Sequence, residues 1–369
     1  MRRAGLAVLL LASACSRSSL PVSTPSGPSS DRLPGLTLHH VSHDIDASPS
    51  YLDGGFRIGP QGTVVNQYDG GDGKLFSILD STGKVVRRFG PIGDGPGEMR
   101  GGGLADVSDS AIIISDENHS RLDRFGLDGH LLSSVRTGQP LIARAAVSDH
   151  EVLALLPTKP ADLPALASVT DGSIRQLVPR ADSFIQSSFA TRTFVNGGVT
   201  SSKLPALGRW PGGFIVADGW EYRLALYGWD GKLRRVLRRD LPRPRLSAAR
   251  ITGVLREELP FASRYGPLSG ADTGRLRAEI AARRQPFFPH SRLALGLDAQ
   301  GRIWVVGIEA DSAFADIFNQ NRFLGRIGLP CPGFSGGWSV HGSWLVLACA
   351  PDDPAFDGNA VFKVFRITD

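Results

Sequence analysis

The sequence has little of what a simple catalytic site requires, and it has no long apolar segment beyond its first residues. Three cysteines occur in 369 residues, and one of them lies near the N-terminus. No later apolar run is long enough to span a bilayer. A Gly-x-Ser-x-Gly nucleophile motif is absent, and the eight histidines are scattered. His39 and His40 are adjacent in an expected strand, so they point to opposite faces and do not favour one metal site.

Turn residues, in contrast, are abundant, with 44 glycines and 25 prolines. A polar or glycine pair before a short apolar-rich strand occurs six times at intervals of roughly forty residues, at residues 61–62, 109–110, 149–150, 212–213, 300–301 and 342–343. A second kind of turn follows an apolar strand end and occurs five times, at residues 82–83, 128–129, 171–172, 230–231 and 320–321. This recurrence predicts repeated units of short antiparallel strands.

The clearest unit covers residues 109–135. An apolar β-branched run at 111–115 is followed by an alternating run at 121–125 and a third run at 130–135. The dipeptide Asp128-Gly129 predicts a two-residue hairpin turn between the last two runs, because both of its residues tolerate positive φ. Such a meander cannot bury its faces alone and must pack against copies of itself.

The last unit lacks its fourth strand, because the chain ends at Asp369 soon after the apolar run 360–367. Residues 36–42 alternate between polar and apolar types and suit the missing strand. A ring of sheets leaves no long sheet edge exposed. We therefore expect an all-β fold, a six-bladed β-propeller over residues 36–369 that is closed by its N-terminal strand.

Residues 240–292 interrupt the repeat and are expected to form a short helical insertion. Helices are predicted over 247–259, which ends at Pro260, and over 272–284. Residues 234–292 contain 14 arginines and five acidic residues, so they account for the basic balance of the whole chain. Two interpretations remain open, a solvated arginine-rich face and a flap that attracts anions. No basic-aromatic motif for nucleic acid is present, so we expect no nucleic-acid partner.

The first 15 residues have the pattern of a processing segment rather than of a folded one. Two arginines precede a short apolar core, and small residues then lead to Cys15. This pattern resembles a bacterial lipoprotein signal, although Ala12 stands where that family prefers Leu. The resemblance implies lipidation of Cys15, and Ser16 in place of Asp favours the outer membrane. An ordinary secretory signal that is cleaved after Ala14 is the alternative. The Ser- and Pro-rich residues 16–35 predict a flexible tether.

Export makes the other two cysteines a candidate pair, since thiols outside the cytoplasm are usually oxidised. Cys331 is expected just before the first strand of the last unit, and Cys349 at the end of the second. These strands are neighbours, so a disulfide is expected. The alternative is two buried free thiols.

Residues 115–129, with the preceding 93–99, resemble an NHL-type repeat. An Asp and an Asn-His-Arg group there precede a Phe and an Asp-Gly turn. Residues 76–89 share the pattern, residues 222–237 share it weakly, and residues 151–178 depart from it. The chain as a whole resembles the six-bladed propeller lipoproteins of bacterial envelopes, and that resemblance implies a scaffold rather than a reaction.

In a propeller, the loops between second and third strands gather on one face around the axis. Every such loop here carries an acidic residue. We expect these loops to contact a ligand through acidic residues and through two aromatic side chains. The acidic residues are Asp69, Asp116, Glu117, Asp218, Glu221, Glu309, Asp311 and Asp353, and the aromatic residues are Trp220 and Tyr222. Carboxylates of this kind also suit Ca²⁺, although acidic residues are common in turns for structural reasons.

Two hypotheses for function follow from these observations. The first is a non-catalytic envelope lipoprotein whose propeller face binds a protein, peptide or glycan, with no cofactor and with a lipid anchor as its contact with the membrane. The second is a Ca²⁺-dependent hydrolase or lyase, similar to propeller lactonases, that acts in the channel. The ligand positions of those enzymes find no residue-by-residue match in this sequence.

Overall fold

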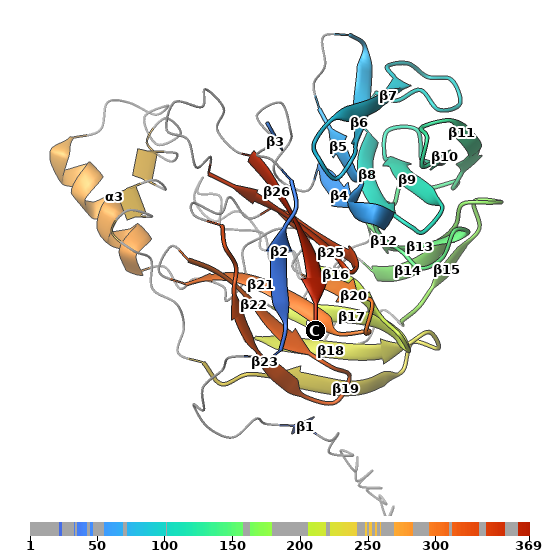
Figure 1. Ribbon diagram of the computed structural model, residues 1–369. Helices are drawn as coiled ribbons and strands as arrows, with labels where there is room; N and C mark the ends of the chain where they lie inside the picture. The colour runs from blue at the N-terminus through green and yellow to red at the C-terminus, as the bar shows by residue number, and fades with distance from the viewer. Residues whose placement is uncertain are drawn as a thin grey trace, which may run out of the picture.

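The computed structural model describes residues 22–23, 33, 35–42, 45–46, 55–68, 72–100, 102–157, 163–178, 206–218, 222–241, 269–282, 295–309, 312–331, 337–350 and 361–369, together with single residues and pairs between 248 and 259. This part of the chain is all-β apart from helical residues near 248–282 and the short 3-10 turn η1 (Pro60–Gly62). The strands form mainly antiparallel sheets built from groups of four strands, which Figure 1 shows arranged around a common centre.

Four of the sheets each contain four consecutive strands. The first has β4 (Phe56–Ile58), β5 (Val64–Gln67), β6 (Lys74–Leu79) and β7 (Val85–Pro91), and the second has β8 (Gly102–Val107), β9 (Ala111–Asp116), β10 (Arg121–Gly126) and β11 (Leu131–Arg136). The third has β12 (Ile142–Ala146), β13 (Glu151–Leu156), β14 (Leu163–Ser168) and β15 (Ile174–Gln176), and the fourth has β16 (Ala206–Trp210), β17 (Gly213–Asp218), β18 (Arg223–Gly228) and β19 (Leu233–Arg238).

The remaining strands form two further groups of four that share one sheet. One group has β20 (Leu295–Asp298), β21 (Ile303–Glu309), β22 (Ser312–Phe318) and β23 (Phe323–Gly328), and the other has β24 (Trp338–Gly342), β25 (Trp344–Cys349), β26 (Val361–Thr368) and β2 (Thr37–His40). A short parallel pairing of β20 with β24 joins the two groups. The two-residue strand β3 (Ile45–Asp46) pairs with β26.

The N-terminal strand β2 pairs antiparallel with the C-terminal strand β26, from Thr37 opposite Thr368 to His40 opposite Phe365. The two strands lie side by side in Figure 1, one blue and one red. Beyond the paired residues, the backbone N–H of Val364 donates to the Ser42 hydroxyl at 2.9 Å. The segment expected to complete the last unit therefore lies in the same sheet as that unit.

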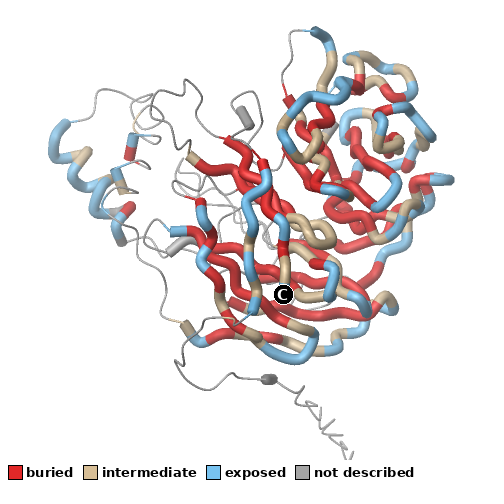
Figure 2. The backbone as a smooth tube through the Cα atoms, viewed as in Figure 1, coloured by how far each residue is buried: buried red, intermediate tan, exposed pale blue. Residues whose placement is uncertain are grey.

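The first strands of the six groups contact one another in chain order. β4 contacts β8, the contacts continue through β12, β16, β20 and β24, and β24 contacts β4 in turn. Six apolar clusters fill the spaces between successive groups, and the cluster between the last and the first contains Phe56, Val64, Val346 and Phe362. Figure 2 shows burial concentrated in the inner strands and exposure at the outer strands. The arrangement is propeller-like.

The second strands of the groups lie where the turn markers predicted them. β9, for example, is buried along its whole length, because its β-branched residues pack against sheets on both sides. The expected two-residue turn at Asp128-Gly129 is wrong. The connection spans residues 127–130, only Gly129 of that dipeptide has positive φ, and a β-bulge between Arg124 and Phe125 accommodates the longer loop.

Two parts of the segment 16–35, which the sequence predicts to be a tether, pair with outer strands. β1 (Val22–Ser23) pairs in parallel with β19, and the backbone N–H of Leu33 donates to the Arg326 carbonyl at 3.1 Å. Gly325 allows this approach, because a Cβ at that position would lie 2.9 Å from Leu33. Outer strands present unpaired backbone groups that an adjacent segment can satisfy.

Of the two expected helices, α3 (Gly270–Ala282) is described in full. It begins two residues earlier than predicted because Ser269 caps it. The backbone N–H of Asp272 donates to Ser269 Oγ at 3.2 Å, and that hydroxyl donates to the Asp272 carboxylate at 2.7 Å. The described residues within 247–259 are also helical. Leu255 and Ile280 are the buried residues of this insertion. No described helix is long and apolar enough to cross a membrane.

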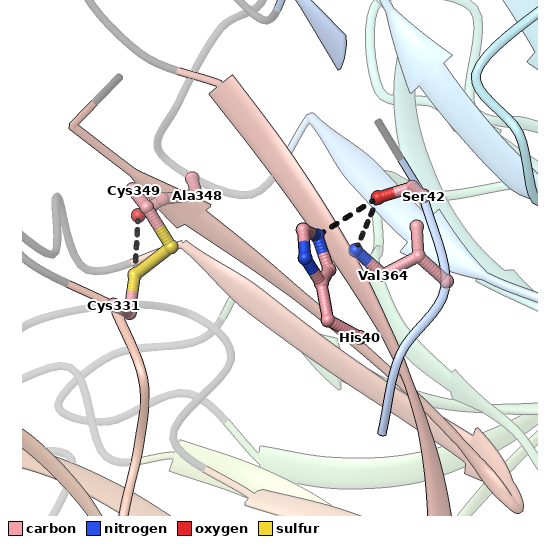
Figure 3. The surroundings of a disulfide bond; sticks show 6 residues. All are labelled: His40, Ser42, Cys331, Ala348, Cys349 and Val364. Atoms are coloured by element: carbon pink, nitrogen blue, oxygen red, sulfur yellow. Dashed lines mark hydrogen bonds between the residues drawn. A yellow bond between two sulfur atoms is a disulfide. The ribbon is translucent and has the colours of Figure 1, made fainter. Parts of the chain in front are cut away.

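A disulfide joins Cys331 to Cys349, with Cα atoms 5.2 Å apart. Figure 3 shows the bond beside β25, with Cys331 also close to the carbonyl oxygen of Ala348. Cys331 follows β23 and Cys349 ends β25, so the bridge ties the segment that leads into the last group to that group's second strand.

Candidate functional site

The acidic loop residues divide between buried, exposed and undescribed positions. Asp116, Asp218 and Glu309 each end the second strand of a group, so they share one register position on three different sheets. Glu117 is exposed in the turn that follows β9. The other expected contacts lie outside the described residues: Asp69, Trp220, Glu221, Asp311 and Asp353. The candidate lipidation site, Cys15, lies outside them as well.

Asp116 is fully buried and its carboxylate is already bound within the protein. It pairs with His119 Nδ1 at 2.6 Å and with Arg121 Nη2 at 3.3 Å. His119 also reaches Asp94 through Nε2 at 3.0 Å, and hydrogen bonding to Asp116 raises the pKa of the imidazole above its usual value. Arg121 pairs in turn with buried Asp123. The NHL-like residues thus form an internal network that fastens loop 93–99 to β9 and β10.

Tyr222 does not lie at a ligand-binding surface, which corrects the expectation from its loop position. Its side chain is fully buried, and its hydroxyl donates a short hydrogen bond to Asp316 on β22. Burial, followed by the charge of Asp316, raises the pKa of Tyr222 well above its usual value. The aromatic ring fills the space between two sheets because the turn before β18 places Tyr222 at φ 46 and directs it inward.

A small hollow of about 50 Å³ lies among the first strands of the six groups. Its lining residues come from β4, β8, β12, β16, β20 and β24, which are the strands that contact one another in a ring. The charged or titratable residues that line it are Arg57, Asp106, Arg144, Arg209 and His341. Sequence reasoning about the loops missed all five of these residues.

The inner strands are joined to one another by hydrogen bonds around the hollow. Arg57 Nε donates to the carbonyl of Ala105 at 3.0 Å, and its nearest approach to the Asp106 carboxylate is 3.9 Å. Asp106 accepts the backbone N–H of Ala146 at 2.8 Å and that of Val107 at 2.9 Å. These bonds fix Asp106 against β12 as well as against its own strand.

Arg209 is held less tightly than the other arginines. Its one hydrogen bond among the described residues is a 3.5 Å contact from Nη1 to the Val147 carbonyl. Arg57 and Arg144 are buried, with 4 % and 9 % of their surfaces exposed, whereas Arg209 is half-buried. Three guanidinium groups and one carboxylate line this hollow, so its charged lining carries an excess of positive charge.

Leu207, Leu295, Leu297, Trp338 and Val340 also line the hollow, although most of its exposed surface is polar. Ser339 Oγ accepts the backbone N–H of Ile58 at 3.2 Å. His341 Nε2 lies 2.9 Å from Asp109, a residue of the turn after β8. Within the described residues, no hydrogen bond joins Ser339 to His341, so this hollow has no paired nucleophile and base.

A sequence signal for the arginines existed, but it lay in the strands rather than in the loops. Arg57, Arg144 and Arg209 each interrupt a short first strand that is otherwise apolar or glycine-containing. A charged residue at the centre of such a strand predicts a polar axis once the strand is known to be the innermost one. The turn markers identified second strands and left the first strands unassigned.

Within the described residues, no group of three His, Cys, Asp or Glu side chains is placed to hold a metal ion. Ca²⁺ binds six to eight oxygen ligands, and this hollow supplies the carboxylate of Asp106 among three arginines. Its lining therefore does not suit a divalent cation.

No protein-family model and no curated protein match this sequence. Among solved structures, the chain is similar to a member of the DUF4221 family from Bacteroides vulgatus, with a TM-score of 0.52, 11% identity, and coverage of 92% of this chain and 100% of the other. It is equally similar to a protein of Bacteroides fragilis that is named as exported, with a TM-score of 0.51, 11% identity, and coverage of 94% and 99%. At these identities the likeness shows a shared fold and nothing about activity.

A sugar dehydrogenase of Streptomyces coelicolor, solved with its cofactor PQQ, also matches. Its TM-score is 0.41 at 13% identity, with coverage of 90% of this chain and 98% of the other. A likeness at this level transfers neither the cofactor nor the reaction to this chain.

Proposed function

We propose that the chain is a non-catalytic envelope lipoprotein, folded as a closed six-bladed β-propeller, that binds a protein, peptide or glycan at its axial hollow. The observation that carries the binding proposal is the hollow itself, with five charged or titratable side chains contributed by strands of different sheets. Convergent polar groups that orient a ligand are a common feature of ligand pockets.

The ring of contacts among first strands supports the six-bladed count. Each of the six groups has four strands, and β24 contacts β4. The pairing of β2 with β26 supports closure of the last blade by the N-terminal strand, since it joins residues 37–40 to residues 365–368. A ring closed in this way leaves only short outer edges.

Export and anchoring rest on the N-terminal pattern that ends at Cys15. The disulfide between Cys331 and Cys349 supports an oxidising compartment. Metabolic labelling with a radioactive fatty acid tests the anchor. The wild-type protein is expected to incorporate label and to fractionate with the outer membrane, and Cys15→Ala is expected to lose both properties. Label in the Cys15→Ala variant would contradict the proposal.

A binding role fits the hollow better than catalysis does. Ser339 is bonded to a backbone N–H, His341 is bonded to Asp109, and Asp106 accepts two backbone N–H groups. Each group that could act as a nucleophile or base is thus engaged in joining strands. The arginines that surround them serve to bind an anionic or polar group rather than to transfer a proton.

Site-specific photo-crosslinking in native membranes tests the binding proposal. The crosslinking residue is placed at exposed Ser110, in the turn between β8 and β9 beside the Asp109 that contacts His341, or at Val86, which is 64% exposed on an outer strand. We expect a defined adduct from position 110 and none from position 86. We also expect Leu297→Trp, which fills the hollow, to abolish the adduct while thermal unfolding stays cooperative. Equal adducts at both positions would contradict a binding site at the axis.

A further inference from the structure

We propose that the group taken up in the axial hollow is an oxyanion, a carboxylate or a phosphate, carried on a small organic body, and that Arg209 is its principal binding residue. This inference rests on the proposed function, because it names the chemical class of ligand for the same hollow. Its evidence is the charge of the lining, the choice of arginine, and the size of the hollow.

The charge of the lining is the first step. Among the described residues that line the hollow, Asp106 is the one with a carboxylate, and it lies nearest Arg57. Its two oxygens also accept the backbone N–H groups of Val107 and Ala146. Arg209 has no carboxylate partner within the described residues. Its single hydrogen bond, 3.5 Å long, uses one of the three nitrogens of its guanidinium group. Like charges that share a low-dielectric hollow repel one another, and a bound anion relieves that repulsion.

The chemistry of the cations is the second step. Every positively charged lining residue, apart from the titratable His341, is an arginine, and none is a lysine. The guanidinium group is planar and presents parallel N–H donors that match the two oxygens of a carboxylate or of a phosphate edge. A site that needed only positive charge would accept lysine equally well, so the arginines favour recognition of an oxyanion by geometry.

The size of the hollow limits what enters it. Its volume is about 50 Å³ and most of its exposed surface is polar, although Leu207, Leu295, Leu297, Val340 and Trp338 also line it. A hollow of this size takes up the anionic group of a ligand, while the rest of a small organic body extends from its open side.

The test is isothermal titration of the full-length protein in detergent with three probes. D-galacturonate carries a carboxylate where D-galactose carries a hydroxymethyl group, so the pair tests the carboxylate alone. Inorganic phosphate is the third probe and supplies the other oxyanion. We expect galacturonate or phosphate, and not galactose, to bind below about 10 mM. We expect this binding to weaken as salt rises from about 50 to about 500 mM, because charge attraction is screened. The better of the two anions identifies the kind of oxyanion.

Variants assign the effect to the hollow. Arg209→Gln is expected to weaken anion binding by at least about tenfold, since a charge-assisted hydrogen bond is lost. Arg209→Lys keeps the positive charge but removes the parallel N–H donors of the guanidinium group, so it is expected to lose most of the affinity for the anion as well. Arg234→Gln is the matched control, because Arg234 is exposed on β19 and pairs with Asp230. It should bind like the wild type, and thermal melts of all variants confirm folding.

The outcomes separate this inference from the function it builds on. If galactose binds as tightly as galacturonate, or if neither anion binds, the oxyanion inference is wrong, while the crosslinking result at position 110 still decides whether the axis binds a partner. If the anion binds but Leu297→Trp and Arg209→Gln leave its affinity unchanged, the hollow is not the site and both proposals fail.

Discussion

The hydroxyl of Tyr222 donates to the carboxylate of Asp316 across the boundary between the fourth and fifth sheets. Asp316 is fully buried and also pairs with Arg239 Nη1 at 2.7 Å and with Arg326 Nε at 2.6 Å. Two guanidinium groups and a phenol thus surround one carboxylate, and Arg326 lies over the Phe314 ring at 3.6 Å. The relationship is structural, since it joins two sheets away from the axial hollow.

Tyr222→Phe should therefore destabilise the fold without changing ligand binding. Removal of one partner from a buried charged group costs about 1–3 kcal/mol, and urea unfolding measures it. Because the pKa of Tyr222 is raised, this contribution is complete below the ordinary tyrosine value of 10.0 and is lost as pH rises toward the raised value. The variant should lack this alkaline loss, and Val86→Ala serves as an exposed control. A Phe variant as stable as the wild type would contradict the assignment.

His119 gives a second pH-dependent test of stability, at a pH nearer neutral than the test of Tyr222. Its pKa is raised above 6.5, first by the hydrogen bond to Asp116. The protonated form is favoured in the folded state, so its contribution is present below pH 6.5 and is lost as pH rises through the raised value. The wild type should be more stable at about pH 5.5 than at about pH 8.5 by an amount that His119→Gln lacks. Glu117→Gln, exposed in the same turn, should keep the wild-type difference, and a His119→Gln variant that also kept it would contradict this account.

The disulfide between Cys331 and Cys349 closes a short loop with a sequence separation of 18. A loop of this length stabilises a fold by about 3 kcal/mol, mainly by restricting the unfolded chain. Dithiothreitol should lower the urea midpoint of the wild-type protein by a corresponding amount. The Cys331→Ala, Cys349→Ala double variant should start at the lower midpoint and should not respond to the reductant. A response in the double variant would place the effect elsewhere.

The boundary between the first and last sheets tests whether the ring is closed. The ring centroids of Phe56 and Phe362 lie 4.5 Å apart. Both side chains are fully buried in the cluster that joins these sheets. Phe362→Ala should cost about 3–5 kcal/mol, because it removes a large side chain from a packed core. Phe365→Ala, in the cluster on the other side of the same strand, is the matched comparison. If Phe362→Ala cost less than about 1 kcal/mol, the two sheets would not form a stable contact.

Removal of divalent cations should leave stability unchanged. The described residues hold no group suited to a metal, and three arginines line the hollow. We expect the melting temperature with and without EDTA to agree within about 1 °C, because an ion stabilises a fold only where the native state binds it, and we expect none to be bound. A fall of several degrees that Ca²⁺ reverses would favour the calcium-dependent enzyme hypothesis instead.

The turn residues were the most informative part of the sequence. Glycine and aspartate at positions such as Asp230 and Gly231 fix where a chain can reverse, so the amino-acid sequence alone located the second strands. The antiparallel partner of the C-terminal strand was also predictable, because one strand was missing and residues 36–42 alternate. Local conformational preference acts over a few residues and therefore shows in the sequence.

The site was not predictable in the same way. The position of Tyr222 in the sequence predicted a loop at the rim of the propeller, whereas the structure buries its side chain in the core. Arg57, Arg144 and Arg209 are separated by more than sixty residues each, and nothing local indicates that they share a space. They meet because the first strands of successive groups contact one another and line one hollow. The turns and the order of the strands were determined by the sequence, whereas the charge of the axial hollow was decided by tertiary contacts, which no single strand encodes.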